Sequence, residues 1–555
     1  MFFTSYEFIG FLILTVILYY LVPKKAQPYC LLVISYLFYL TAGAGCLVYI
    51  ALITAIAYVS AMAIEHNREK QKRCVRYESF FCVDINNKDE NGVPDPAALK
   101  EAVKQFKKKQ QKIRARMFAA GVVCLLLVLI FAKYLGFLID NLNGIASVFG
   151  RTEPLIANNT LGLIMPMGIS FYTLQAIGYL IDVNRENIAA ERNFFKFALF
   201  ISFFPQLVQG PISKFEDLSK TLFASHKFDK QNVIYGMQRI LWGFFKKMVI
   251  ADRILIGVGK IMQDPLQYNG AYVFFGMLLF SLELYTDFSG GIDIAIGTAQ
   301  MLGITLTENF DRPYFSKSLK EYWRRWHMSM CNWFRTYLFF SVSTAKWMQS
   351  FSKFCKRKMS PSIGKNLPIF AASFIVWLAT GLWHGASWNY VIWGLLNWAV
   401  LMISEILEPS YRKFREKHGF TSSNAWKLFQ MIRTFLLISV MNVFDWALSP
   451  ATLLKSLAGI FTTGNWHIIW DGSFFDLGYT VADMIIIAVG LIIVLTVSLL
   501  QTDGHASNVN EIRDRISKLA FGWRYLIWLG LFLAVLLFGT YGIGYDASQF
   551  IYNRF

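Results

Sequence analysis

Two histidines in aromatic settings are the residues most suited to chemistry. His327 follows the run Tyr322-Trp323-Arg324-Arg325-Trp326, and His384 ends an apolar segment that closes Thr380-Gly381-Leu382-Trp383. A single histidine on an apolar face is more often structural, but two that each follow a tryptophan favour a functional role. An imidazole with an ordinary pKa near 6.5 accepts a proton from a hydroxyl at neutral pH. We therefore predict that His384 is a general base and that His327 is a second functional histidine.

Other reaction classes lack their motifs. The chain has no Gly-x-Ser-x-Gly nucleophile elbow, no P-loop, no His-Glu-x-x-His and no Gly-x-Gly-x-x-Gly after a strand. Its seven cysteines do not have the spacing of metal ligands. The sequence thus argues against covalent serine catalysis, nucleotide hydrolysis and metal-dependent hydrolysis. We expect no metal and no bound cofactor, which leaves direct transfer to a hydroxyl.

Three carboxylates lie inside a predicted membrane span. Glu283, Asp287 and Asp293 belong to the apolar run 271–300, and Ser289-Gly290-Gly291 lies between the last two. A charged residue at the centre of a membrane helix costs about 2.5 to 3.5 kcal/mol on insertion scales, so such residues have a role. One reading pairs them structurally with arginines such as Arg324 or Arg325. The other has them hold helices together or orient a histidine.

Composition predicts the elements that must position these residues. Of 555 residues, 55% are hydrophobic and only 16% are charged, and the mean hydropathy is +0.41. Apolar runs of about 20 residues, the length of a membrane-spanning helix, recur along the whole chain. We predict an all-α, polytopic membrane protein with roughly twelve spans in one membrane domain, residues 1–555. The apolar stretch 203–211 is too short to span and is expected to be re-entrant.

The charge pattern indicates how the chain is threaded. The net charge of +18 comes from Lys and Arg between the apolar runs, which fits cytoplasmic loops rather than nucleic-acid binding. Residues 65–116 form a predicted basic cytoplasmic loop whose second half, 96–116, should be a helix. This helix either faces lipid head groups or binds an acidic carrier protein.

Both chain termini are expected to be extracytoplasmic. His384 then lies near the outer end of its helix and His327 on the inner side, like two ends of a passage.

The order of several motifs resembles a known family. The matching blocks are 165–184, 203–211, 285–297, 309–333 and 381–393, which include Asp287-Phe288-Ser289-Gly290 and Gly381-Leu382-Trp383-His384-Gly385. Together they are similar to the membrane-bound O-acyltransferases, in the bacterial branch of alginate and peptidoglycan O-acetyltransferases and the teichoic-acid D-alanyl transferase.

The resemblance implies specific roles. His384 would be catalytic, His327 would be the second characteristic histidine, and acetyl-CoA would be the co-substrate that enters from the cytoplasm. The acceptor would be a hydroxyl of a cell-envelope polysaccharide or of an extracytoplasmic acyltransferase partner, and the location would be a bacterial plasma membrane. The residues expected to bind substrates are Trp323, Arg324, Arg325, Trp383 and Asn309.

Two other functions remain open at this level. Within the same family, D-alanyl transfer to teichoic acid from an acyl carrier protein would suit the basic cytoplasmic surfaces. A polysaccharide or lipid transporter is the alternative from a different class, and it would have no need of His384.

Overall fold

The chain is built from helices. The computed structural model describes residues 1–76, 96–157, 166–446, 448–501, 511–542 and 545–546, and every regular element within these ranges is helical. The predicted all-α class is confirmed. The helices group into two compact units, one of residues 19–207 and 213–225 and the other of residues 1–18, 208–212 and 226–555. The single membrane domain stays a prediction.

The unit of residues 19–207 and 213–225 contains eight labelled α-helices and one long basic hairpin. Its helices are α2 (Gln27–Leu40), α3 (Ala44–Arg76), α4 (Pro96–Leu129), α5 (Leu135–Val148), α6 (Ile169–Asn184), α7 (Phe194–Ser202), α8 (Phe204–Leu207) and α9 (Phe215–Leu222), with a π-helical turn, η2 (Ile130–Tyr134), joining α4 to α5.

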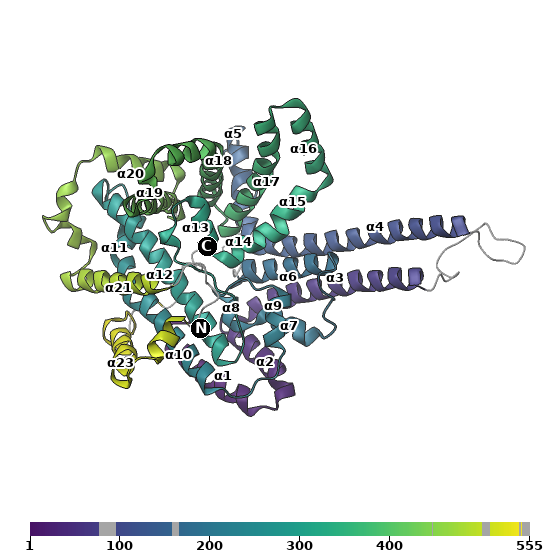
Figure 1. The fold of residues 1–555 in the computed structure, drawn as a ribbon, viewed down its shortest axis with the longest axis horizontal. Helices are drawn as coiled ribbons and strands as arrows, with labels where there is room; N and C mark the ends of the chain where they lie inside the picture. The colour runs from purple at the N-terminus through teal and green to yellow at the C-terminus, as the bar shows by residue number, and fades with distance from the viewer. Residues whose placement is uncertain (77–95, 158–165, 447, 502–510, 543–544, 547–555) are drawn as a thin grey trace, which may run out of the picture. The chain divides into compact units, whose positions relative to one another are not determined.

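Helices α3 and α4 run side by side and form this basic hairpin (Figure 1). The amide of Asn67 donates to that of Gln110 across their interface at 2.6 Å. The helix predicted over 96–116 is confirmed, and it continues into the apolar part of α4 without a break. Residues 77–95 of the predicted basic loop lie outside the described residues. The predicted re-entrant stretch 203–211 is the short helix α8 followed by buried non-helical residues.

The other unit carries all the predicted site residues. After α1 (Tyr6–Leu21), its helices are α10 (Lys230–Phe244), α11 (Asp252–Gln263), α12 (Ala271–Met301), α13 (Leu319–Arg325), α14 (Met328–Trp333), α15 (Phe340–Thr344), α16 (Lys346–Lys358), α17 (Pro361–His384), α18 (Trp388–Lys417), α19 (Asn424–Asn442), α20 (Pro450–Thr462), α21 (Val481–Leu500), α22 (Glu511–Ser517) and α23 (Phe521–Phe538), with π-helical turns η4 (Phe245–Ala251) and η6 (Phe334–Phe339).

Eight helical segments among the described residues are long and apolar enough to cross a membrane. They coincide with eight of the roughly twelve predicted spans. The other four correspond to the shorter helices α1 and α2, to α6 and to the α10–η4 segment, so the count of twelve is not reproduced by length and apolarity alone. The polytopic membrane character is nevertheless clear.

The core of this unit is the packing of α10 and η4 against α12. Two glycines allow the close approach: a Cβ added to Gly243 would lie 2.6 Å from the backbone oxygen of Gly290. Much of α12 is buried on all sides from Thr286 to Ala299. This buried half of α12 is the surface on which the site is assembled.

Candidate active site

His384 is the last residue of α17, at the tight turn into α18. Gly385 makes the turn possible, because a Cβ there would lie 2.1 Å from ring carbons of Tyr390. The His384 ring packs against Trp393, with centroids 4.6 Å apart, and lies 6.4 Å from the stacked ring of Tyr390. The glycine after the histidine therefore brings α18 aromatics against the imidazole.

His327 lies between the short helices α13 and α14. Its backbone is left-handed, with φ 44°, which is uncommon for a residue with a side chain. The side chain is fully buried, and its ring lies edge-on to Phe288 of α12 at 4.9 Å between centroids. Such a conformation persists only where the surroundings hold it, and it is typical of functional positions.

Asn309 fixes which nitrogen of His327 carries the proton. The Oδ1 atom of Asn309 accepts the backbone N–H of Ser329 at 3.0 Å and the Ser329 hydroxyl at 2.9 Å. Because a backbone N–H only donates, the amide orientation of Asn309 is determined. The Nδ1 atom of His327 lies 3.2 Å from the same Oδ1, so Nδ1 carries the hydrogen. The Nε2 atom of His327 therefore carries the lone pair.

Both imidazoles lie against the indole of Trp383. The centroid of Trp383 is 6.0 Å from that of His327 and 5.1 Å from that of His384, and Trp383 is only 5% exposed. The expectation that the two histidines lie toward opposite sides of the membrane, at two ends of a passage, is wrong. Loop charges predict which side a segment enters from, but not how deeply it folds back, and His327 folds back onto α12 and α17.

Burial determines the charge state of His327. Desolvation, with a smaller contribution from the electrostatic influence of His384, holds the pKa of His327 well below the usual value of 6.5. Burial in this position disfavours the charged form of the imidazole. His327 is therefore neutral at physiological pH, and the neighbouring His384 does not face a second positive imidazole.

The remaining predicted site residues, Trp323, Arg324 and Arg325, differ in how close they lie to the two histidines. Trp323 is buried, donates its indole N–H to Asn397 at 3.0 Å, and packs on Trp393, which in turn contacts His384. Arg325 forms an ion pair with Glu321 within α13 at 2.8 Å. Arg324 is exposed. Trp323 thus supports the histidine site from behind, while the described contacts of the two arginines do not lie at the histidine rings.

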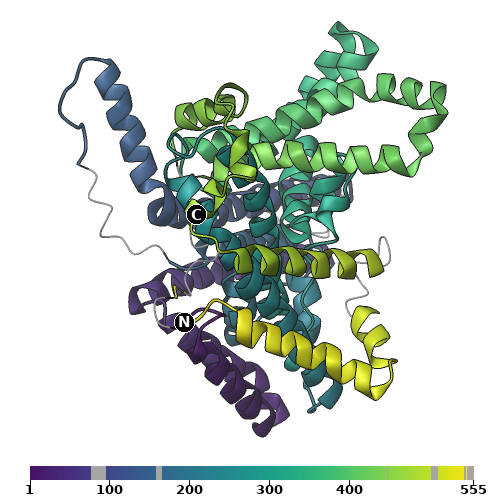
Figure 2. The ribbon, with the colours of Figure 1, turned by 90° about the vertical axis from the view of Figure 1, so that its left-hand side faces the viewer.

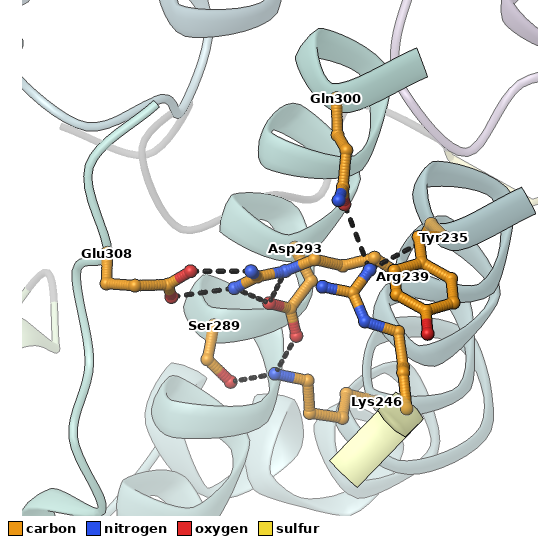
Figure 3. Close-up of polar contacts among 8 residues, drawn as sticks. Tyr235, Arg239, Lys246, Ser289, Asp293, Gln300 and Glu308 are labelled. Atoms are coloured by element: carbon orange, nitrogen blue, oxygen red, sulfur yellow. Dashed lines mark hydrogen bonds and ion pairs between the residues drawn. The ribbon is translucent and has the colours of Figure 1, made fainter. Parts of the chain in front are cut away.

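Asp287 and Asp293 of α12 are paired with cations of α10 and η4. Asp293 accepts from Arg239 at 2.8 and 2.9 Å and from Lys246 at 2.6 Å (Figure 3). Asp287 pairs with Lys247 at 2.5 Å. The structural pairing is as expected, but the partners are not Arg324 or Arg325. These pairs join α12 to its neighbour in the core.

Two consecutive lysines reach α12 because of the π-helical turn. Lys246 and Lys247 are both buried, at 4% and 0% exposure, and both lie in η4. A π-helix places more residues in each turn than an α-helix, so neighbouring side chains point in more similar directions. Sequence reasoning missed this cluster. Its signal was the pair of lysines inside an apolar run, which can be there only if paired.

Among the described residues, no group of three or more His, Cys, Asp or Glu side chains is arranged to hold a metal ion. What the site offers is two imidazoles at one indole, with one of them in a defined neutral tautomer. Such groups can accept and return a proton.

Comparison with known proteins shows what the chain is similar to. Residues 185–444 match the family model described as MBOAT, membrane-bound O-acyltransferase family. The chain is 33% identical over 356 residues to a probable alginate O-acetylase AlgI of Azotobacter vinelandii. The aligned residues make up 64% of this chain and 64% of that one. It is 30% identical over 369 residues to a peptidoglycan O-acetyltransferase of Helicobacter pylori, covering 61% of this chain and 63% of that one.

A more distant match is the teichoic acid D-alanyltransferase of Bacillus subtilis, 30% identical over 270 residues, or 48% of this chain and 64% of that one. The chain spans about 64% of the length of the Azotobacter relative. Asn309, His327, Asp287, Asp293 and His384 all fall within the matched residues. The family resemblance predicted from the motifs is confirmed: residues 185–444 of this polytopic chain match the model of the membrane-bound O-acyltransferase family.

Proposed function

We propose that the protein is a membrane O-acyltransferase that moves an acetyl group from a cytoplasmic thioester donor to a hydroxyl. The observation that carries the proposal is the pair of imidazoles against Trp383, one neutral and fixed in its tautomer. The similar proteins are named for O-acetylation or D-alanylation, which supports transfer to oxygen. The acceptor would be a cell-envelope polysaccharide or an extracytoplasmic partner protein, and the location a bacterial plasma membrane.

In the proposed reaction His384 accepts the proton of the acceptor hydroxyl while that oxygen attacks the thioester carbonyl carbon. The tetrahedral intermediate collapses as the C–S bond breaks, and His384 returns the proton to the departing thiolate. The products are an ester and a thiol, and no other reactant is needed. A neutral His327 favours this cycle, because a charged neighbour would oppose protonation of His384. General base catalysis of this kind contributes roughly 10² to 10⁴ in rate.

The donor assignment is the second part of the proposal. Acetyl-CoA carries phosphates, and Arg324, which is exposed, and Arg325 are cations that would position it. The positive-inside rule puts these arginines on the cytoplasmic side and both termini outside. No resident cofactor is needed for this reaction.

The experiment is a transfer assay with the purified full-length protein in nanodiscs. Radiolabelled acetyl-CoA is supplied with a neutral polysaccharide acceptor, and label in the polymer is measured. Transfer from acetyl-CoA supports the proposal. Turnover only with a D-alanyl or acetyl thioester of an acyl carrier protein would identify the carrier protein, in place of acetyl-CoA, as the donor. If no donor transfers its label to the polymer, the protein would be a transporter instead.

A further inference from the structure

A cavity in the C-terminal half of the chain has two chemically different sides. It has a volume of about 500 Å³ and lies between α10, η4 and α12 on one side and α21 to α23 on the other. Its α21 and α23 side is apolar and includes Ile493, Val497, Leu526, Leu531 and Ala534. In Figure 2 these two helices are the separate olive and yellow rods.

The opposite side of the cavity is charged. Among its lining residues are Asp293 and Lys246, joined as described above, and Arg239, which reaches both Asp293 and Glu308 (Figure 3). Arg513 of α22 donates to the Gln300 side chain at 2.9 Å. Ionised groups among membrane-spanning helices pair with one another and face the bundle interior or a polar cavity, and the groups on this side of the cavity do both.

The signs of the charges balance. Four basic side chains line the cavity, and they are Arg239, Lys246, Arg312 and Arg513. Four acidic side chains line it as well, and they are Asp293, Glu308, Asp311 and Glu511. A strongly anionic ligand such as a nucleotide-bearing thioester would need a net positive lining. A ligand that carries one positive and one negative group matches the lining better.

The exposure of helix α23 indicates that the ligand comes from the membrane. No residue of α23 from Phe521 to Phe538 is buried, so lipid must cover much of this apolar helix. An occupant of the cavity therefore meets charged groups at one end and hydrocarbon at the other. Only an amphiphile satisfies both ends without leaving apolar surface in water.

We propose that this cavity binds a glycerophospholipid with a zwitterionic head group. The phosphate lies toward the guanidinium groups of Arg239 and Arg513, the ammonium lies toward Glu308 and Asp311, and the acyl chains follow the α21 and α23 wall into the bilayer. Guanidinium and phosphate form paired charge-assisted hydrogen bonds, which gives the head group a fixed orientation. The site is separate from the proposed acyl-transfer chemistry and does not rest on it.

Two glycines of α23 provide a matched test. Gly530 lines the cavity and Gly522 does not, yet a Cβ at either position would meet nothing within 4 Å. Gly530→Trp therefore fills the cavity, whereas Gly522→Trp adds the same side chain to the same helix outside it. Ala534→Trp is a second filling variant, in case Gly530→Trp alters folding.

The full-length proteins are purified in mild detergent, delipidated and titrated with dioctanoyl phosphatidylethanolamine under native mass spectrometry. We expect one lipid per chain in the wild type and in Gly522→Trp, and binding weaker by about tenfold or more in both filling variants. Phosphoethanolamine and free phosphate, which lack chains, should bind far more weakly. Equal binding in all variants would overturn the proposal. The proposal would also be overturned if the wild type bound phosphatidylglycerol or a coenzyme A thioester more tightly than phosphatidylethanolamine and the filling variants abolished that binding.

Discussion

The Nδ1 atom of His327 lies 3.2 Å from the Oδ1 atom of Asn309, and this contact assigns the proton of the buried imidazole to Nδ1. Asn309 is itself held by two hydrogen bonds from Ser329. The backbone of His327, which makes this contact, is left-handed. The neutral state of the site is thus built from a loop, a short helix and one amide.

Replacing Asn309 by Asp should change the pH dependence of activity. A carboxylate at 3.2 Å from Nδ1 would favour the imidazolium, so the pKa of His327 should rise from its depressed value. Protonated His327 then opposes proton transfer to His384. We expect the acidic limb of the kcat profile to move to higher pH by about one unit or more. Asn309→Ser, which adds no charge, is the control, and an unchanged limb in Asn309→Asp would contradict the assigned contact.

The depressed pKa of His327 also predicts how stability depends on pH. In the unfolded chain this histidine titrates near 6.5, whereas in the folded protein it binds a proton only at much lower pH. Between these two values the unfolded state holds more protons, so stability falls as the pH falls below 6.5. The slope from this one group is about 1.4 kcal/mol per pH unit.

Thermal unfolding of the detergent-solubilised protein from pH 7.5 to 5 measures this slope. The variant His327→Gln should lose this contribution and unfold with a shallower pH dependence. His418→Gln, at a residue outside the core, should keep the wild-type dependence. Parallel curves for the wild type and His327→Gln would show that His327 does not carry the effect.

Gly385→Ala should lower the rate without removing the protein from the membrane. The new Cβ would lie 2.1 Å from carbons of the Tyr390 ring, so the ring must shift, and His384 stacks on it. We expect kcat to fall by about 10-fold to 100-fold through misplacement of the imidazole. Gly419→Ala, where a Cβ meets nothing within 4 Å, is the control. Wild-type turnover in Gly385→Ala would mean that this packing does not orient His384.

Much of this arrangement was predictable from the sequence, and what was missed has physical causes. The Gly-Leu-Trp-His-Gly motif marked His384 because an imidazole at the end of a long apolar run needs partners or water. Hydropathy predicted helix α12 because its apolar run is long. The placement of His327 and His384 against the same indole, Trp383, was not predictable, because it depends on how a short basic segment folds back on α12.

The ion pairs of α12 illustrate the same limit. A buried carboxylate requires a cation, which the sequence indicates, but arginines close along the chain were the wrong choice. The partners Lys246 and Lys247 become neighbours of Asp293 and Asp287 through the packing of η4 on α12. Only a tertiary contact, together with a π-helical turn, brings two adjacent lysines to one helix.

Breaking this network should destabilise the protein strongly. Asp293→Asn would leave Arg239 and Lys246 buried with one anion fewer, and removing one partner of a buried pair costs about 3 to 5 kcal/mol. The exposed pair Lys320–Glu405 is the comparison, because Glu405→Gln should cost less than about 1 kcal/mol. The check is the unfolding midpoint of each variant in denaturant. Equal midpoints would contradict the structural weight given to Asp293.

The most direct test of the central claim is acyl transfer by His384→Gln. Glutamine keeps a similar volume and a polar end but cannot act as a base at neutral pH. In nanodiscs with labelled acetyl-CoA, we expect the single-turnover rate to fall by about 10² to 10⁴, while the amount of protein in the membrane and its unfolding temperature stay those of the wild type. Transfer within about twofold of the wild-type rate would contradict the role of His384 as the general base.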